Sequence, residues 1–221
     1  MSAPLSTPVK ATLIAVTVAV ILAIVGVVYA LTQQPPAPDV AEDGSLQTVR
    51  ADSHVLDDAG ADAVTVVEFL DFECEACGAF HPIVEDIREK HAGDITYVVR
   101  YFPLPGHVNS MQAALAAEAA AGQGRFEDMY HRLFETQSEW SHAAGETPAV
   151  FRAHAEDLGL DLAAYDAAIA DPATRERILA DKTDGESLGI GSTPSFFVDG
   201  RYVQLQEWDD LEEAIERAVT G

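Results

Sequence analysis

The alternation of apolar and polar positions after residue 45 predicts two strands with a helix between them. Residues 64–70 are apolar and β-branched, as in a buried strand, and residues 95–102 form a second such run that ends at a proline. Between them, apolar side chains recur at helical spacing over residues 80–87, with Pro82 inside the helix. This order predicts a right-handed crossover between two parallel strands.

The next segment, from residue 108 to about 188, has helical spacing throughout. One apolar stripe within it predicts a core-facing helix: Phe126, Met129, Tyr130, Leu133 and Phe134. Gly159 is expected to end a second helix, and Asp171-Pro172 to begin a third as N-cap and first helical residue. The segment therefore reads as an all-helical insertion.

After Gly191 the pattern returns to strands. A strand at 195–198, a turn at 199–200 and a strand at 202–205 predict a hairpin. Residues 207–219 predict a closing amphipathic helix with Trp208, Leu211 and Ile215 facing inward. Together these elements predict one α/β domain over residues 46–221.

Residues 11–31 are consecutive uncharged, mostly aliphatic residues, about 31 Å long as a helix and long enough to cross a bilayer core of about 30 Å. Lys10 is the only charge before them and acidic residues follow, so residues 1–10 are expected in the cytoplasm and the domain outside, after a proline-rich linker at 32–45. The alternative is a signal peptide cleaved near Ala30. Both interpretations export the domain.

The formal net charge of −24 comes from 37 acidic and 13 basic side chains, and every acidic residue follows residue 38. Such a surface repels nucleic acid and anionic lipid head groups. No nucleic-acid partner is therefore expected, and the charge is explained by solubility.

The only cysteines, Cys74 and Cys77, lie between the first strand and the following helix. A thiol at a helix N-terminus is favoured as thiolate, so Cys74 is predicted to attack and Cys77 to resolve a mixed disulfide. A structural zinc site would need four ligands and no second cysteine pair exists, while a disulfide across two residues would constrain the unfolded chain little. Redox chemistry without a metal or cofactor is the favoured interpretation.

Four segments resemble the DsbA family of exported thiol-disulfide oxidoreductases, from about residue 50 to the C-terminus. They are Val67-Glu-Phe-Leu-Asp-Phe-Glu-Cys-Glu-Ala-Cys77, Phe102-Pro-Leu-Pro-Gly-His107, Ala113-Ala-Leu-Ala-Ala-Glu-Ala-Ala120 and Gly191-Ser-Thr-Pro-Ser-Phe-Phe-Val-Asp-Gly200. The resemblance implies a thioredoxin-like fold with an all-helical insertion, here preceded by one transmembrane helix.

The resemblance also implies site residues. Thr193-Pro194 matches a cis-proline loop that faces the cysteines and binds substrate backbone, and Glu68 matches a buried acid that relays protons to Cys77. The alternative for Glu68 is a side chain turned to solvent at the strand end. Two lone histidines near the motif, His81 and His107, are expected to be ordinary surface residues.

The motif departs from the Cys-Pro-His-Cys of strongly oxidising relatives, because Glu75-Ala76 stands between the cysteines and Glu73 precedes them. Both carboxylates are expected to raise the pKa of Cys74. The reduction potential is then expected between about −120 mV, as in DsbA, and about −270 mV, as in thioredoxin.

The sequence predicts a membrane-tethered oxidase of cysteine-containing exported proteins, re-oxidised by a quinone-linked membrane partner. The second hypothesis is a reductase or isomerase that uses the same two cysteines and is kept reduced by a membrane electron donor. A tethered peptide-binding or chaperone module with a structural disulfide is the third hypothesis.

Overall fold

The computed structural model describes residues 47–221. The predicted cytoplasmic segment 1–10, the anchor at 11–31 and the linker at 32–45 lie outside the described residues. Among the helices of residues 47–221, none combines the length and the apolar character needed to cross a bilayer.

The centre of the domain is a five-stranded sheet in the order β1-β3-β2-β4-β5. Its strands are β1 (His54–Asp57), β2 (Val64–Leu70), β3 (Ile95–Tyr101), β4 (Ser195–Val198) and β5 (Arg201–Tyr202). The two predicted strands β2 and β3 pair in parallel, while β1, β4 and β5 each pair antiparallel to a neighbour. The parallel pairing of these two strands is thus as predicted. Sequence patterning missed β1, a half-exposed edge strand with no continuous apolar face.

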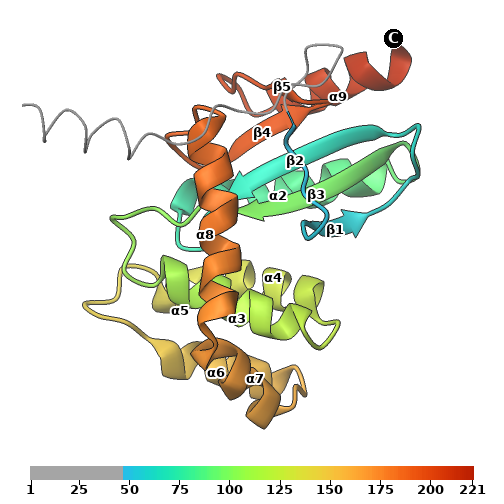
Figure 1. Cartoon of the computed structure of the whole chain (residues 1–221). Coiled ribbons are helices and arrows are strands. Elements are labelled where there is room, and N and C mark those ends of the chain that lie inside the picture. Colours follow the sequence, from blue (N-terminus) through green and yellow to red (C-terminus); the bar gives the residue numbers. More distant parts are fainter. Residues whose placement is uncertain (1–46) are drawn as a thin grey trace, which may run out of the picture. The chain divides into compact units, whose positions relative to one another are not determined.

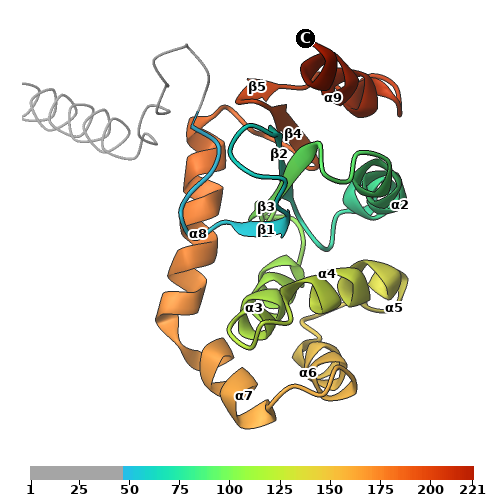
Figure 2. The same cartoon turned by 90° about the vertical axis from the view of Figure 1, so that its right-hand side faces the viewer.

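Helices cover both faces of the sheet (Figure 2). Strand side chains alternate: Val66 and Phe196 join the core beneath α2 (Glu75–Lys90) and α9 (Asp210–Thr220), while Val67 and Phe197 join a smaller cluster on the opposite face, next to the end of α8 (Pro172–Ser187). Period-2 alternation with apolar residues on both faces explains why β2 and β4 are buried throughout apart from Thr65.

The insertion between β3 and β4 is helical, as predicted; in Figure 1 α3 to α7 lie below the sheet and α8 runs from them up to the level of the sheet. It contains α3 (Ser110–Ala121), α4 (Phe126–Glu135), α5 (Gln137–Trp140), α6 (Pro148–Asp157), α7 (Leu162–Ala170) and α8. The whole apolar stripe of α4 is buried. Gly159 follows α6 with a φ of +72°, and the Asp171 carboxylate caps α8 by accepting the N–H of Ala173 at 2.9 Å.

The end of the chain differs from the prediction at Trp208, which is 57% exposed and lies before α9 instead of on its inner face. The Asp210 carboxylate accepts the N–H groups of Gln206 and Glu207, so the helix begins after this turn. Trp208 packs against the ring of Phe80 at 4.9 Å between centroids. Leu211 and Ile215 are fully buried, as expected.

A buried ion pair fastens α8 to the sheet. Arg100 of β3 and Asp181 of α8 are each 1% exposed, and the guanidinium donates to one carboxylate oxygen at 2.7 and 2.9 Å. The helix also packs closely against the chain after β3 at Gly185. A side chain would not fit there, because a Cβ on Gly185 would lie 2.7 Å from the Phe102 ring. Since α8 leads directly into residues 188–194, this contact fixes the origin of the loop that carries Thr193 and Pro194.

Candidate active site

Cys74 lies where the chain leaves the sheet and α2 begins. It is the N-cap residue, with extended backbone angles, and both cysteines are free thiols. Cys74 is 7% exposed and Cys77, one turn into the helix, is fully buried. The sulfur of Cys74 is therefore the one that another molecule can reach, although it is less exposed than the motif suggested.

The loop that carries Thr193 and Pro194 faces this sulfur. The Thr193-Pro194 peptide bond is cis, as the family resemblance implies, and the Cys74 Sγ lies 3.4 Å from the Thr193 carbonyl oxygen. The Thr193 hydroxyl is buried and has no hydrogen-bond partner among the described residues. As a thiol, Cys74 donates to the carbonyl; as a thiolate, it can accept from the free hydroxyl.

The two cysteines have opposite acidities. Stabilisation of the ionised sulfur by the Cys77 thiol, with further contributions from the Thr193 side chain and the backbone N–H groups of Cys77 and Ala76, lowers the pKa of Cys74 to about 5 despite partial burial. Burial, together with the neighbouring Cys74 charge, raises the pKa of Cys77 well above its usual range. At neutral pH the reduced pair therefore holds one thiolate and one thiol.

Glu68 is buried in β2, as predicted, with 2% of its surface exposed. Burial raises its pKa to about 7, against the opposing hydrogen bond that the Tyr97 hydroxyl donates to it at 2.8 Å. Its charge contributes to the raised pKa of Cys77. The solvent-facing alternative for Glu68 is excluded.

The predicted effect of Glu73 and Glu75 was wrong, because the pKa of Cys74 is lowered. Glu73 is 1% exposed and its carboxylate accepts the backbone N–H groups of Asn109, at 2.5 Å, and His142, at 3.2 Å. Glu75 points into solvent, where it pairs with the His142 ring at 2.8 Å. Neighbouring donors and water thus screen both charges, and hydrogen bonds to the sulfur dominate.

Several residues that support this loop were not predicted. The Gln137 amide donates to the carbonyl oxygens of Phe72 and Cys74 at 2.8 and 2.9 Å, and a Cβ on Gly78 would collide with it. The Asp71 carboxylate accepts the N–H groups of Glu73 and Leu104 at 2.9 and 2.8 Å. Asp71 directly follows a buried strand, which is a usable signal, whereas nothing in sequence links Gln137 to the cysteines.

The two histidines differ from expectation, since both are partly buried. His107 binds Asp71 at 2.7 Å, and this contact raises the pKa of His107 in spite of its partial burial. Burial lowers the pKa of His81 to about 4, so its ring is uncharged at neutral pH. His81 faces α4 and not the thiols, since its ring packs against Tyr130 and Phe134.

Comparison with known proteins gives three informative matches. The family model described as Thioredoxin matches residues 53–217. A thioredoxin-like oxidoreductase from Silicibacter pomeroyi DSS-3 has a TM-score of 0.65 and 28% identity, covering 78% of this chain and 95% of that one. Wolbachia pipientis alpha-DsbA1 has a TM-score of 0.68 and 22% identity, covering 79% and 94%.

A curated relative, the Na(+)/H(+) antiporter NhaA 1 of Mycobacterium sp. (strain KMS), is 36% identical over 153 residues, which are 67% of this chain. The chain spans between 20% and 24% of the length of the curated relatives it matches. The similarity to these proteins is therefore that of a part to a much longer whole.

The Thr193 hydroxyl gives a direct test of how the Cys74 thiolate is stabilised. Thr193→Val keeps the shape and removes the donor, so it is expected to raise the Cys74 pKa and to lower its acid dissociation constant about 10- to 100-fold, the range for one hydrogen bond to a charged group. Thiolate absorbance against pH measures this. Thr193→Ser is the matched control, and its pKa should stay near that of the wild type. Equal pKa values in all three proteins would contradict the assignment.

Proposed function

Because the chain belongs to the thioredoxin family and has the DsbA-like form of that fold, we propose that it is an exported oxidase that uses Cys74 and Cys77 to form disulfides in other proteins. The fold and the oxidoreductase class predicted from the sequence agree with these matches. One observation carries the proposal: a sulfur that favours the thiolate lies at a helix N-terminus beside the Thr193 carbonyl, with a buried second thiol one turn behind it.

In the proposed reaction the enzyme starts with a Cys74–Cys77 disulfide. A substrate thiolate attacks the Cys74 sulfur, a substrate–Cys74 disulfide forms, and Cys77 leaves and takes up a proton. A second substrate thiolate then attacks the substrate sulfur of that bond. The substrate is oxidised by two electrons, and the enzyme is left with a Cys74 thiolate and a Cys77 thiol, the state that the two acidities favour.

The acidity of Cys74 supports a moderately strong oxidant. Its pKa of about 5 lies between about 3.5, for the attacking cysteine of DsbA, and about 7, for that of thioredoxin. A more stable thiolate stabilises the reduced enzyme and thus makes its disulfide more oxidising. A potential between those of DsbA and thioredoxin remains the expectation, although now from hydrogen bonds to the sulfur and not from the glutamates.

The proposed setting is the outer face of the cell membrane, with residues 11–31 as a single anchor and cysteine-containing exported proteins as substrates. The length and apolar character of that segment support the anchor, and an oxidising compartment suits the reaction. Each turnover leaves the enzyme reduced, so it needs an electron acceptor, for which we propose a quinone-linked membrane oxidase. Secretion after cleavage near Ala30 is the alternative localisation.

The roles of the two cysteines predict different trapping behaviour. Cys77→Ser is expected to accumulate a mixed disulfide, formed when the Cys74 thiolate attacks a disulfide of a substrate and displaces one substrate thiolate, because the neighbouring Cys77 sulfur that would release the substrate is missing. Cys74→Ser should accumulate at least about tenfold less, because Cys77 is buried and its pKa is raised. Non-reducing electrophoresis with mass spectrometry measures both. The reverse pattern would exchange the roles, and no adduct with either variant would favour a binding module.

The direction of the reaction predicts the redox state in cells. An oxidase is expected to be mostly in the disulfide form at steady state, and a reductase mostly in the thiol form. Intact cells are treated with a membrane-impermeant alkylating reagent before and after mild reduction. Labelling that appears only after reduction supports an exported oxidase. Labelling before reduction indicates the reductase, and labelling only after cell lysis contradicts export.

Glu68 predicts the pH dependence of proton exchange with Cys77. Glu68→Gln is expected to remove an inflection near pH 7 from the rate of thiol exchange and to slow it about 100-fold at pH 8, where wild-type Glu68 is ionised and can accept a proton. Stopped-flow exchange with a model disulfide measures this rate. Glu75→Gln is the control, because its carboxylate is exposed.

Stability provides an independent check on Glu68. Its folded-state pKa of about 7 exceeds the ordinary value of 4.5. The contribution of Glu68 to the free energy of unfolding is therefore fully present below pH 4.5, where the carboxyl is protonated, and is lost as the pH rises to about 7. Denaturant titrations should show that loss in the wild type and not in Glu68→Gln. Identical pH profiles of rate and stability would leave Glu68 without a role as a relay.

A further inference from the structure

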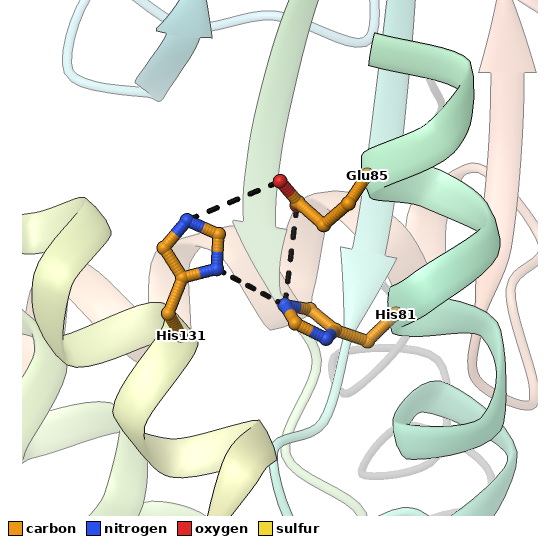
Figure 3. Close-up of side chains that lie close together, drawn as sticks. All are labelled: His81, Glu85 and His131. Carbon is orange, nitrogen blue, oxygen red and sulfur yellow. Dashed lines mark hydrogen bonds and ion pairs between the residues drawn. The ribbon is translucent and has the colours of Figure 1, made fainter. Parts of the chain in front are cut away.

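Two histidines and a glutamate from different helices converge between α2 and α4, one to two helical turns beyond Cys77. Figure 3 shows His81 and Glu85 on α2 and His131 on α4, with one ring nitrogen of His131 facing His81 and the other facing Glu85. The His81 Nε2 lies 3.2 Å from the His131 Nδ1, and the Glu85 carboxylate lies 3.9 Å from a nitrogen of each ring. All three residues are partly buried.

The separation of the two imidazole nitrogens matches the first coordination sphere of a transition metal, and one ligand atom of Glu85 lies within 4.8 Å of both. Two imidazole nitrogens bound to tetrahedral Zn²⁺ at about 2.0–2.1 Å are about 3.3 Å apart, close to the separation of the His81 and His131 nitrogens. Glu85 follows His81 by one helical turn, the i, i+4 spacing that lets two side chains of one helix bind a single ion. Two histidines and a glutamate with water in the fourth position form a known zinc ligand set.

The charges around the cluster also favour a cation. Arg88 donates to three carboxylates, those of Asp57, Glu85 and Glu127, at distances of 2.5 to 3.0 Å. One guanidinium among three ionised carboxylates leaves a formal excess of two negative charges. The Glu127 carboxylate also lies 3.8 Å from the His131 Nε2, the ring nitrogen that does not face His81, and adds negative charge beside the cluster. A divalent cation would balance this excess.

We propose that His81, Glu85 and His131 bind one divalent transition-metal ion of the zinc class, which cross-links α2 to α4. The site goes beyond the disulfide chemistry and does not depend on its direction. Its position gives it a structural consequence: α2 carries both cysteines and α4 belongs to the helical insertion, so the ion would fix the insertion against the helix whose first residues form the active site.

A second cluster of similar composition, His91 with Glu212 and Glu216, is a weaker candidate. The Lys90 ammonium pairs with both of its carboxylate ligands, whereas in the first cluster Arg88 pairs with the single carboxylate ligand Glu85 and is shared with Asp57 and Glu127. This cluster therefore serves as an internal comparison in the experiment.

The test uses the full chain with Cys74→Ser and Cys77→Ser, so that no thiolate competes for metal. Calorimetric titration with Zn²⁺ is expected to show one ion per chain, reversed by a chelator, and Co²⁺ is expected to give the visible spectrum of a tetrahedral site without sulfur ligands. His131→Gln and His81→Gln should each weaken Zn²⁺ binding by at least about 100-fold, since they remove direct ligands. Zn²⁺ should raise the melting temperature of the parent and not that of His131→Gln.

Two controls make the result decisive. His142→Gln removes an exposed histidine elsewhere and should leave Zn²⁺ affinity unchanged, and Glu212→Gln tests the second cluster. His131 is the more exposed ligand, so its variant is expected to fold even if the His81 variant does not. Absence of saturable binding to the folded parent would overturn the proposal. So would binding that survives His131→Gln, or that is lost in Glu212→Gln.

Discussion

An acidic Cys74 sulfur requires hydrogen-bond donors from two distant parts of the chain to meet at one edge of the sheet. The groups that stabilise the thiolate belong to two parts of the chain: the first turn of α2, which supplies the Cys77 thiol and two backbone N–H groups, and the loop at Thr193, 119 residues away in sequence, whose free side-chain hydroxyl can donate to the ionised sulfur. A local motif can supply the first group only. The second requires a sheet that holds α2 and the Thr193-Pro194 loop at the same edge.

The buried ion pair and the close packing of α8 help to hold the Thr193-Pro194 loop at the same edge of the sheet as α2. A buried pair of charges is weak evidence for stability, because desolvation offsets much of the attraction. Arg100 and Asp181 nevertheless fix α8 at one position on β3, since a shift of α8 would take both Asp181 and Asp184 away from the buried Arg100 guanidinium, although Asp181 would keep its pair with Arg177. Because the loop with Thr193 and Pro194 begins where α8 ends, the position of α8 also determines where this loop starts. Specific placement is thus a better account of the pair than net stabilisation.

Sequence reasoning succeeded where a signal is local. The β2 and β3 runs, the stop at Gly159, the cap at Asp171 and the cysteines at a strand-to-helix junction each depend on residues within one or two turns. It failed where residues that are neighbours in space are far apart in the sequence. Glu73 was expected to repel a thiolate, yet its carboxylate turns away to bind backbone N–H groups of the insertion. Contacts such as Gln137 with Cys74, or His81 with His131, bridge 63 and 50 residues and leave no pattern in the chain.

The three buried acids of the site are ordered in strength, and the order determines how protons and electrons are coupled. Cys74 ionises near pH 5, Glu68 near pH 7, and Cys77 well above its usual range, so Glu68 is the one buried group of the three that titrates near neutrality. Burial is the main cause of the raised Glu68 pKa, and the Cys74 charge adds to it. Oxidation to the disulfide removes that charge, which must lower the Glu68 pKa and release part of a proton near pH 7. Reduction must take it up again, so the pH dependence of the reduction potential is a property of Glu68 as much as of the sulfurs.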